Sequence, residues 1–186
     1  MHESHRRIFL AIMLTPHWQK KISNLHPSLN ALNLSTMRVI PPEKLHITLH
    51  FWANANLEQI RTLLNCTKQF CQYFPAFSVA LGDIELFPSE TRPYVLAIKI
   101  KQANVLRAFR ENLSQQFFEY GIPVERRTYK PHISIARIAQ KIAAHNPLIL
   151  QPLDQEPMYV ASISLLESTF NAHENIYTPL AKFELQ

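Results

Sequence analysis

Glycine is almost absent from this chain, with Gly82 and Gly121 as the only two among 186 residues. Glycine-rich loops, whose backbone N–H groups surround the phosphates of bound nucleotides, therefore cannot form. The turns have to rest on proline, asparagine and aspartate instead, and the chain carries 13 prolines.

Cysteine and long apolar runs are scarce as well. Cys66 and Cys71 lie five residues apart in a segment with helical periodicity, so they point in different directions and form no CxxC pair. We interpret them as reduced, partly buried thiols of a cytoplasmic protein. No apolar run is long enough to span a bilayer, and the short N-terminal run lacks a cleavage site, so we expect the fold to begin there.

Charge of neither sign dominates. Lys and Arg number 19 against 14 Asp and Glu, which gives a formal net charge of +5 without any dense basic run. This balance suits an anionic partner such as RNA, but it also fits proteins without one. Hydrophobic residues make up 47% of the chain and charged residues 18%, which excludes disorder.

What the chain does contain is strict alternation over residues 45–51 (LHITLHF). Period two predicts a β-strand, in which His46, Thr48 and His50 share one face and the apolar residues, Phe51 included, share the other. At about 3.3 Å per residue, His46 and His50 would lie about 13 Å apart. That separation is too large for two ligands of one zinc ion.

The same motif occurs twice. Residues 44–49 (KLHITL) return 86 residues later as 130–135 (KPHISI), and residues 9–12 (FLAI) return with the same offset as 95–98 (VLAI). Two motifs that share one ungapped offset indicate a duplicated unit. We therefore predict a single domain over residues 1–186, with motifs at 46–49 and 132–135 and a lobe boundary near residues 88–93.

Periodicity along the chain predicts an α+β fold. The expected helices are a short one opened by Thr15-Pro16, one marked by apolar residues from 57 to 74, and one at 105–119. The expected strands cover residues 7–14, the two histidine motifs, 77–87, 94–101, 159–169 and 177–185. We expect a duplicated two-lobe fold: antiparallel sheets related by a pseudo-twofold, helices on the outside, and a central cleft.

Two such strands can supply acid–base chemistry. If the lobes face each other, His46 and Thr48 line one wall of the cleft and His132 and Ser134 line the other. Two imidazoles with ordinary pKa values near about 6.5 can act as one general base and one general acid. The hydroxyls and the guanidinium of Arg137 would bind a charged centre, so the set points to phosphodiester chemistry without a metal.

The chain resembles the 2H phosphoesterases and, within them, the bacterial RNA 2',3'-cyclic phosphodiesterases, also called 2'-5' RNA ligases. The resemblance rests on the segments RRIFLAI (6–12), LHITLHF (45–51), KPHISIAR (130–137) and IYTPLAKFEL (176–185). It implies that His46 is the proton donor and His132 the proton acceptor. It further implies that a phosphate is contacted by Thr48, Ser134 and Arg137, and that a base stacks on Phe51.

The implied partner is RNA, or a nucleotide, with a 2',3'-cyclic phosphate, in a cytoplasmic monomer without a cofactor, metal or membrane. The implied product end is a 2'-phosphate, and the reverse reaction would form a 2'-5' linkage. Two alternatives stay open at this point: a non-catalytic RNA-binding module of the same fold, and a metal-dependent hydrolase. The sequence leaves the role of His50 open, and also the choice among tRNA ends, oligonucleotides and small cyclic phosphates.

Overall fold

The computed structural model describes residues 5–31, 37–89, 93–101, 103–125, 127–138, 156–171 and 174–186. Its helices are α1 (Pro16–Ser23), α2 (His26–Ala31), the short 3₁₀ helix η1 (Pro42–Lys44), α3 (Leu57–Cys71) and α4 (Asn104–Glu119). Its strands are β1 (Arg6–Met13), β2 (Met37–Val39), β3 (His46–Ala55), β4 (Phe77–Phe87), β5 (Val95–Lys101), β6 (His132–Ile138), β7 (Pro157–Val160), β8 (Ser162–Phe170) and β9 (Asn175–Glu184).

The sheet carries the predicted duplication in its strand order. The order is β7-β4-β5-β6-β3-β1-β8-β9, with β2 pairing on β6, and every pair is antiparallel. Its six central strands split into β4-β5-β6 and the mirrored series β8-β1-β3. The two halves meet where Ile47 of β3 pairs with Ile133 of β6. These residues are 86 positions apart, so the pseudo-twofold passes between them.

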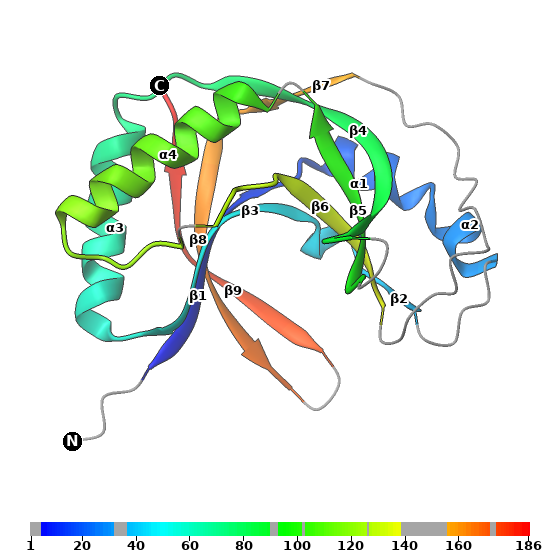
Figure 1. Cartoon of the computed structure of the whole chain (residues 1–186), viewed down its shortest axis with the longest axis horizontal. Helices are drawn as coiled ribbons and strands as arrows, with labels where there is room; N and C mark the ends of the chain where they lie inside the picture. The colour runs from blue at the N-terminus through cyan, green and yellow to red at the C-terminus, as the bar shows by residue number, and fades with distance from the viewer. Residues whose placement is uncertain are drawn as a thin grey trace.

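The α+β architecture with two related antiparallel halves is therefore confirmed, and the halves join edge to edge in one sheet. Figure 1 shows this sheet curled into an arch, with α3 and α4 lying together over its outer side and the β8–β9 hairpin reaching away from them. The lobe boundary near residues 88–93 stays a prediction, since residues 90–92 lie outside the described part of the chain.

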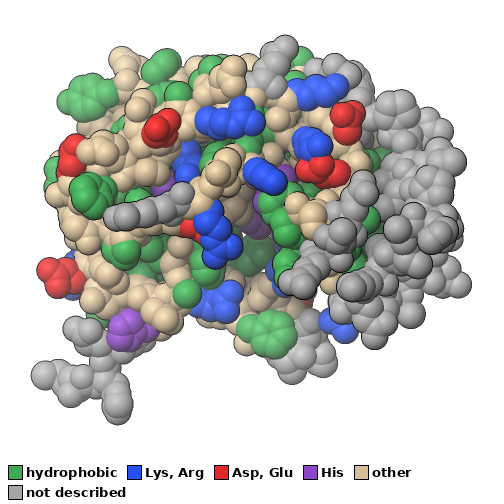
Figure 2. All heavy atoms as spheres, in the orientation of Figure 1, with side chains coloured by type: hydrophobic (Ala, Val, Ile, Leu, Met, Phe, Trp, Pro, Cys, Tyr) green, Lys and Arg blue, Asp and Glu red, His purple; other side chains and the backbone are tan. Residues whose placement is uncertain are grey.

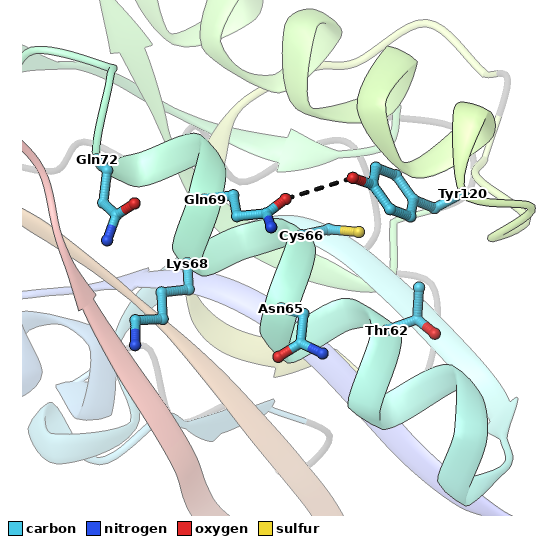
Figure 3. Close-up of a pocket in the computed structure, with 7 residues that line it drawn as sticks. All are labelled: Thr62, Asn65, Cys66, Lys68, Gln69, Gln72 and Tyr120. Atoms are coloured by element: carbon cyan, nitrogen blue, oxygen red, sulfur yellow. Dashed lines mark hydrogen bonds between the residues drawn. The ribbon is translucent and has the colours of Figure 1, made fainter.

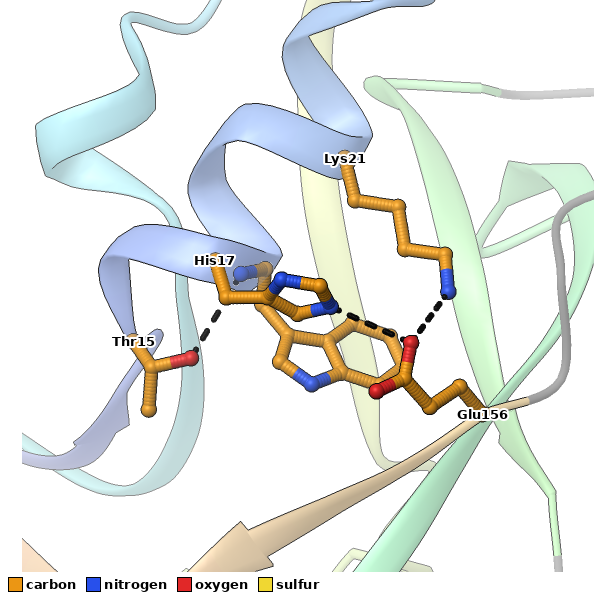
Figure 4. A network of polar contacts seen from close by, with 5 residues as sticks. Thr15, His17, Lys21 and Glu156 are labelled. Carbon is orange, nitrogen blue, oxygen red and sulfur yellow. Dashed lines mark hydrogen bonds and ion pairs between the residues drawn. The ribbon is translucent and has the colours of Figure 1, made fainter.

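The helices begin where the sequence places their caps. Thr15 accepts a hydrogen bond from the backbone N–H of Trp18 at 3.4 Å, and Pro16 occupies the first turn of α1. Asn56 and Gln59 form a reciprocal capping box at the start of α3. Glu156, just before β7, accepts hydrogen bonds from two side chains of α1, His17 and Lys21 (Figure 4).

A continuous core lies between the sheet and the helices α3 and α4. Phe109 of α4 is fully buried and packs against Phe70 and Phe74 at ring-centroid distances of 5.2 and 4.8 Å. Cys66 and Cys71 are free and buried, and burial raises the pKa of the Cys71 thiol to about 12. No helix in the described part of the chain is long and apolar enough to cross a membrane.

A β-bulge in β3 corrects the predicted alternation. Leu10 of β1 pairs with His50, but Ala11 pairs with Thr48, so Leu49 is an extra residue on β3. Leu49 and His50 are consequently both buried, at 2% and 3% exposure, and Phe51 turns to the opposite side of the sheet. The prediction that His50 shares a face with His46, and Phe51 the opposite face with Ile47, is wrong because one inserted residue reverses the faces that follow.

The second half repeats this bulge in β6. Leu96 of β5 pairs with Ala136 and Ala97 pairs with Ser134, which leaves Ile135 as the extra residue. Arg137 follows the bulge as Phe51 follows the first one, 86 residues earlier. The bulge thus brings Arg137 to the same side of β6 as His132 and Ser134, although five residues separate Arg137 from His132.

Other departures from the predicted elements are local. The strand expected at 159–169 is divided at Ala161 into β7 and β8, which pair with different neighbours. The short elements α2 and β2 have no clear periodic signal in the sequence. At the end of α4, Gly121 adopts a φ of 73°, a conformation that few residues other than glycine adopt without strain.

Candidate active site

A cleft of about 910 Å³ opens beside the junction of β3 and β6. Figure 2 shows a hollow on one face of the molecule, with histidine at its floor and Lys and Arg side chains around its rim. The cleft brings together five of the six residues predicted for the site: His46, Thr48, Phe51, Ser134 and Arg137. The sixth, His132, lies beside it with its ring stacked on Phe87 at a centroid distance of 3.9 Å.

The two motifs lie on adjacent strands of the curved sheet. Because Ile47 pairs with Ile133, the antiparallel register places position 46 opposite position 134 and position 48 opposite position 132. Each histidine is therefore next to the hydroxyl residue of the other motif. The two walls expected for the cleft are these neighbouring strands.

Both catalytic candidates are oriented by the same backbone contact. Nδ1 of His46 lies 2.7 Å from the carbonyl oxygen of Lys44, and Nδ1 of His132 lies 2.9 Å from that of Lys130. A carbonyl oxygen only accepts, so Nδ1 carries the proton in each ring. Nε2 is then free to accept a proton when the ring is neutral and to donate one when the ring is charged.

The environment lowers the pKa of both imidazoles. For His46 the main cause is burial; the nearby charges of His132 and Arg137 lower its pKa further, against the opposing effect of the Lys44 carbonyl. Burial also lowers the pKa of His132, and the Lys130 carbonyl and the carboxylate of Glu85 oppose this shift. The neighbouring side-chain charges thus favour a proton on His132 and disfavour one on His46.

Aromatic rings hold the His46 imidazole in place. The ring centroid of Phe9 lies 5.1 Å from that of His46, and the ring of Tyr177 meets His46 edge-on at 5.5 Å. Phe9 and Tyr177 also contact each other edge-on at 4.9 Å. These rings come from β1 and β9, which flank β8, so two strands that are distant in sequence fix one imidazole.

Arg137 and Phe51 occupy equivalent positions after the two bulges. When the Asn175 amide is turned so that its oxygen faces Arg137, this oxygen accepts hydrogen bonds from the two terminal nitrogens of Arg137 at 3.2 and 2.7 Å. Phe51 is 43% exposed, and the guanidinium of Arg7 lies 5.3 Å from its ring centroid. A stacking surface and an oriented cation are thus both available in the cleft.

His50 lies on the core side of the sheet. Its ring stacks on Trp52 and meets Phe117 edge-on, at centroid distances of 5.5 and 5.4 Å. Nε2 of His50 lies 3.2 Å from the hydroxyl oxygen of Ser114 on α4. Burial first, and the charge of Arg110 second, lower the pKa of His50 to about 3. His50 is therefore a neutral core residue and does not reach the cleft.

Two residues that sequence reasoning missed support the first bulge. The hydroxyl of Tyr129 donates to the carbonyl oxygen of Thr48 at 2.9 Å, and Nε of Arg110 donates to that of Leu49 at 3.0 Å. The Arg110 guanidinium also lies 4.7 Å from the Tyr129 ring centroid. Tyr129 stands three residues before His132, so it links the second motif to the backbone of the first. The position of Tyr129 just before that motif is the sequence feature that could have identified it.

Another depression lies on α3, away from both motifs (Figure 3). Its lining residues are Thr62, Asn65, Cys66, Lys68, Gln69, Gln72 and Tyr120. It contains one cation and no acid–base pair, so it offers no comparable chemistry. Within the described ranges, no three His, Cys, Asp or Glu side chains gather where they could hold a metal ion.

Comparisons with known proteins show the family of this chain. A family model described as the 2'-5' RNA ligase superfamily matches residues 15–169. A Bacillus subtilis protein named RNA 2',3'-cyclic phosphodiesterase is 32% identical over 104 residues, which cover 56% of this chain and 57% of that protein. A Methanothermobacter thermautotrophicus protein of the same name is 24% identical over 186 residues, which cover 96% of this chain and 98% of that one.

Solved structures share the fold over almost the full length. A Thermus thermophilus protein superimposes with a TM-score of 0.80 at 25% identity, covering 96% of this chain and 97% of that one. Escherichia coli LigT, solved in complex with 3'-AMP, superimposes with a TM-score of 0.76 at 23% identity, covering 98% of this chain and 99% of LigT.

Proposed function

The chain belongs to the 2'-5' RNA ligase superfamily, and from this premise we propose that it is an RNA 2',3'-cyclic phosphodiesterase. Such an enzyme is a hydrolase that opens the cyclic phosphate at an RNA end. The observation that carries the proposal is the pair His46 and His132, each with Nδ1 bound to a backbone carbonyl and Nε2 left for proton transfer. The pair lies on adjacent strands, next to two hydroxyl residues and one arginine.

In the proposed reaction, Nε2 of His132 accepts a proton from a water molecule, whose oxygen attacks the phosphorus. The bond between phosphorus and O3' breaks, and Nε2 of His46 gives its proton to the departing O3'. The product carries a 2'-phosphate and a free 3'-hydroxyl. An in-line displacement needs base and acid on opposite sides of the phosphorus, which two histidines from two strands can provide.

The charge that develops on the phosphate oxygens needs donors. Thr48 and Ser134 each supply a hydroxyl, and Arg137 supplies a permanently charged guanidinium already oriented by Asn175. Fixed donors of this kind stabilise a charged transition state because they need little reorganisation. Each of the three is therefore assigned a phosphate contact.

Substrate binding favours the protonated form of His46. The charges beside His46 disfavour its proton. A bound cyclic phosphate is an anion, and an anion next to His46 favours the charged imidazole. The substrate itself thus supplies the state in which His46 is the acid. Run in reverse, the same groups would join a 5'-hydroxyl to a cyclic end in a 2'-5' linkage.

Phe51 is assigned to the base of the terminal nucleotide. Its exposed ring lines the cleft beside Thr48 and carries the Arg7 guanidinium over one face. Stacking on aromatic rings is a common way to hold unpaired RNA bases. A base on Phe51 would place the ribose and its cyclic phosphate toward the histidines.

The test is hydrolysis of an oligoribonucleotide that ends in a 2',3'-cyclic phosphate, measured with EDTA present. We expect turnover by the wild type and a loss of at least about 10²-fold in His46→Ala and in His132→Ala, in line with general acid–base groups. His17→Ala, an exposed histidine on α1, is the matched control and should keep its activity. Binding without turnover would instead favour the RNA-binding module, and activity that EDTA removes and zinc restores would favour the metal-dependent hydrolase.

A further inference from the structure

Two arginines stand directly opposite each other at the edge of the cleft. Arg38 of β2 pairs with Arg137 of β6, and both line the cleft. Residues that are direct partners across an antiparallel pair project to the same side, and like charges in that position destabilise the pair. An anion bound between the two guanidinium groups would offset this repulsion.

Among the described residues, no carboxylate neutralises either arginine, whereas Lys44 at the same cleft has a carboxylate partner. This partner is Glu174. In the part of the chain that the structure describes, the side chain of Arg137 bonds to the uncharged amide of Asn175. Within the described ranges the guanidinium of Arg38 has no side-chain partner, which leaves it to solvent or to a ligand there.

The two guanidinium groups serve different positions. Arg137 is close enough to His46 to lower its pKa, so it belongs with the reacting phosphate. Arg38 lies on β2, which pairs with the same edge of β6 as β3 but farther along that strand, so Arg38 is beside Arg137 and displaced along β6 from the Ile47–Ile133 pair. An RNA chain presents its next phosphate on the 5' side of the terminal ribose. Building on the proposed function, we infer that Arg38 binds this second phosphate, so that the enzyme prefers RNA ends over lone cyclic nucleosides.

The surroundings of Arg38 suit a longer ligand. Tyr94 also lines the cleft, across β6 from Arg38, with 65% of its surface exposed, and its backbone carbonyl accepts a hydrogen bond from the N–H of Ile138 at 2.9 Å. An exposed, anchored aromatic ring offers a place for a second base. The cleft volume of about 910 Å³ lies near the upper end of the usual range for small-molecule sites.

The experiment compares three substrates that end in a 2',3'-cyclic phosphate: adenosine 2',3'-cyclic phosphate, the same nucleotide with a 5'-monophosphate, and the dinucleotide ApA with a terminal cyclic phosphate. The proteins are the wild type, Arg38→Ala, Arg38→Lys and Arg107→Ala. Arg107 is exposed on α4 and contacts Asn104, so its removal matches the change in net charge outside the cleft.

We expect Arg38→Ala to lower kcat/KM for the two substrates with the extra phosphate by about tenfold or more, as for loss of a hydrogen bond to a charged group. The value for the substrate without it should change less than twofold, and Arg38→Lys should retain part of the effect. On the dinucleotide, the slope of log kcat/KM against log salt should fall by about 0.7. If Arg38→Ala lowered kcat/KM only for the substrate with a 5'-monophosphate and not for the dinucleotide, Arg38 would bind a nucleotide phosphate and the inference for RNA would be overturned.

The melting temperature separates binding from structure. In phosphate-free buffer, Arg38→Ala should melt at the wild-type temperature or above it, because the substitution removes a repulsion. A lower melting temperature, or an equal loss on all three substrates, would overturn the inference while leaving the proposed function intact. If the wild type turned over none of the three, the proposed function itself would fail.

Discussion

The buried His50 predicts how the stability of this protein depends on pH. In the folded protein the pKa of His50 is lowered to about 3, mainly by burial, whereas in the unfolded chain it returns to about 6.5. Between these values the unfolded state binds a proton that the folded state does not. The contribution of His50 to stability is therefore complete above about pH 6.5 and is lost as the pH falls toward 3.

The magnitude follows from the two pKa values. Between pH 7.5 and pH 5.0 the folded ring stays neutral while the unfolded one becomes charged, which costs about 2 kcal/mol of unfolding free energy. This figure hardly changes if the folded pKa is one unit higher. His50 is only 3% exposed, so solvent screening does not reduce it.

The perturbation is His50→Gln, which keeps a polar group facing Ser114 and removes the titration. Urea unfolding of both proteins at pH 7.5 and 5.0 gives four free energies. The wild type should lose about 2 kcal/mol more than the variant between the two pH values. The other histidines are present in both proteins, so their contributions cancel. Equal losses in the two proteins would refute the placement of a neutral His50 in the core.

Three further predictions concern the cleft. Phe51→Ala should weaken nucleotide binding by about 1–3 kcal/mol, seen in KM, with little change in melting temperature because the ring is exposed; a large drop in melting temperature with an unchanged KM would contradict this. Tyr129→Phe should cost about 1–3 kcal/mol of stability and lower kcat, because it leaves the Thr48 carbonyl without its donor; Tyr120→Phe, which removes a surface bond, is the control. The optimum of kcat/KM should lie below about pH 6.5, since burial lowers the pKa of both catalytic histidines in the free protein; an optimum above pH 7.5 would be inconsistent with that environment.

Periodicity and repetition were sufficient to predict the architecture. Alternation identified the strands that carry His46 and His132, and the 86-residue offset identified the pseudo-twofold that the Ile47–Ile133 pair now marks. These features are local or internal to the sequence, so they can be read without knowing which strands meet. The same offset related Thr48 to Ser134 before their strands were known to be neighbours.

The bulges could not be read in this way. One extra residue at Leu49 reverses the faces of all later positions in β3, and the groups that stabilise it are distant in sequence. Arg110 lies 61 residues from Leu49, and Tyr129 lies 81 residues from Thr48. Alternation alone therefore placed Phe51 on the face of Ile47 and His50 on the face of His46. Only tertiary contacts decide between the two registers.

The opposed arginines escaped sequence reasoning for a similar reason. Arg38 belongs to a three-residue strand without a periodic signal, and its partner Arg137 lies 99 residues away in the chain. A short edge strand is determined by what it pairs with rather than by its own residues. The pairing, and with it the charge of the cleft edge, is a property of the folded sheet.

Phosphorus NMR of a single turnover tests the central claim most directly. An oligoribonucleotide with a 2',3'-cyclic phosphate end is mixed with excess protein and EDTA, and the resonance of the cyclic phosphate is followed. The account predicts that this resonance disappears and that a phosphomonoester on the 2' oxygen replaces it, with His46→Ala and His132→Ala leaving the cyclic resonance in place. A phosphomonoester on the 3' oxygen would contradict the assigned roles, and a cyclic resonance that persists with the wild type would contradict the proposed enzyme.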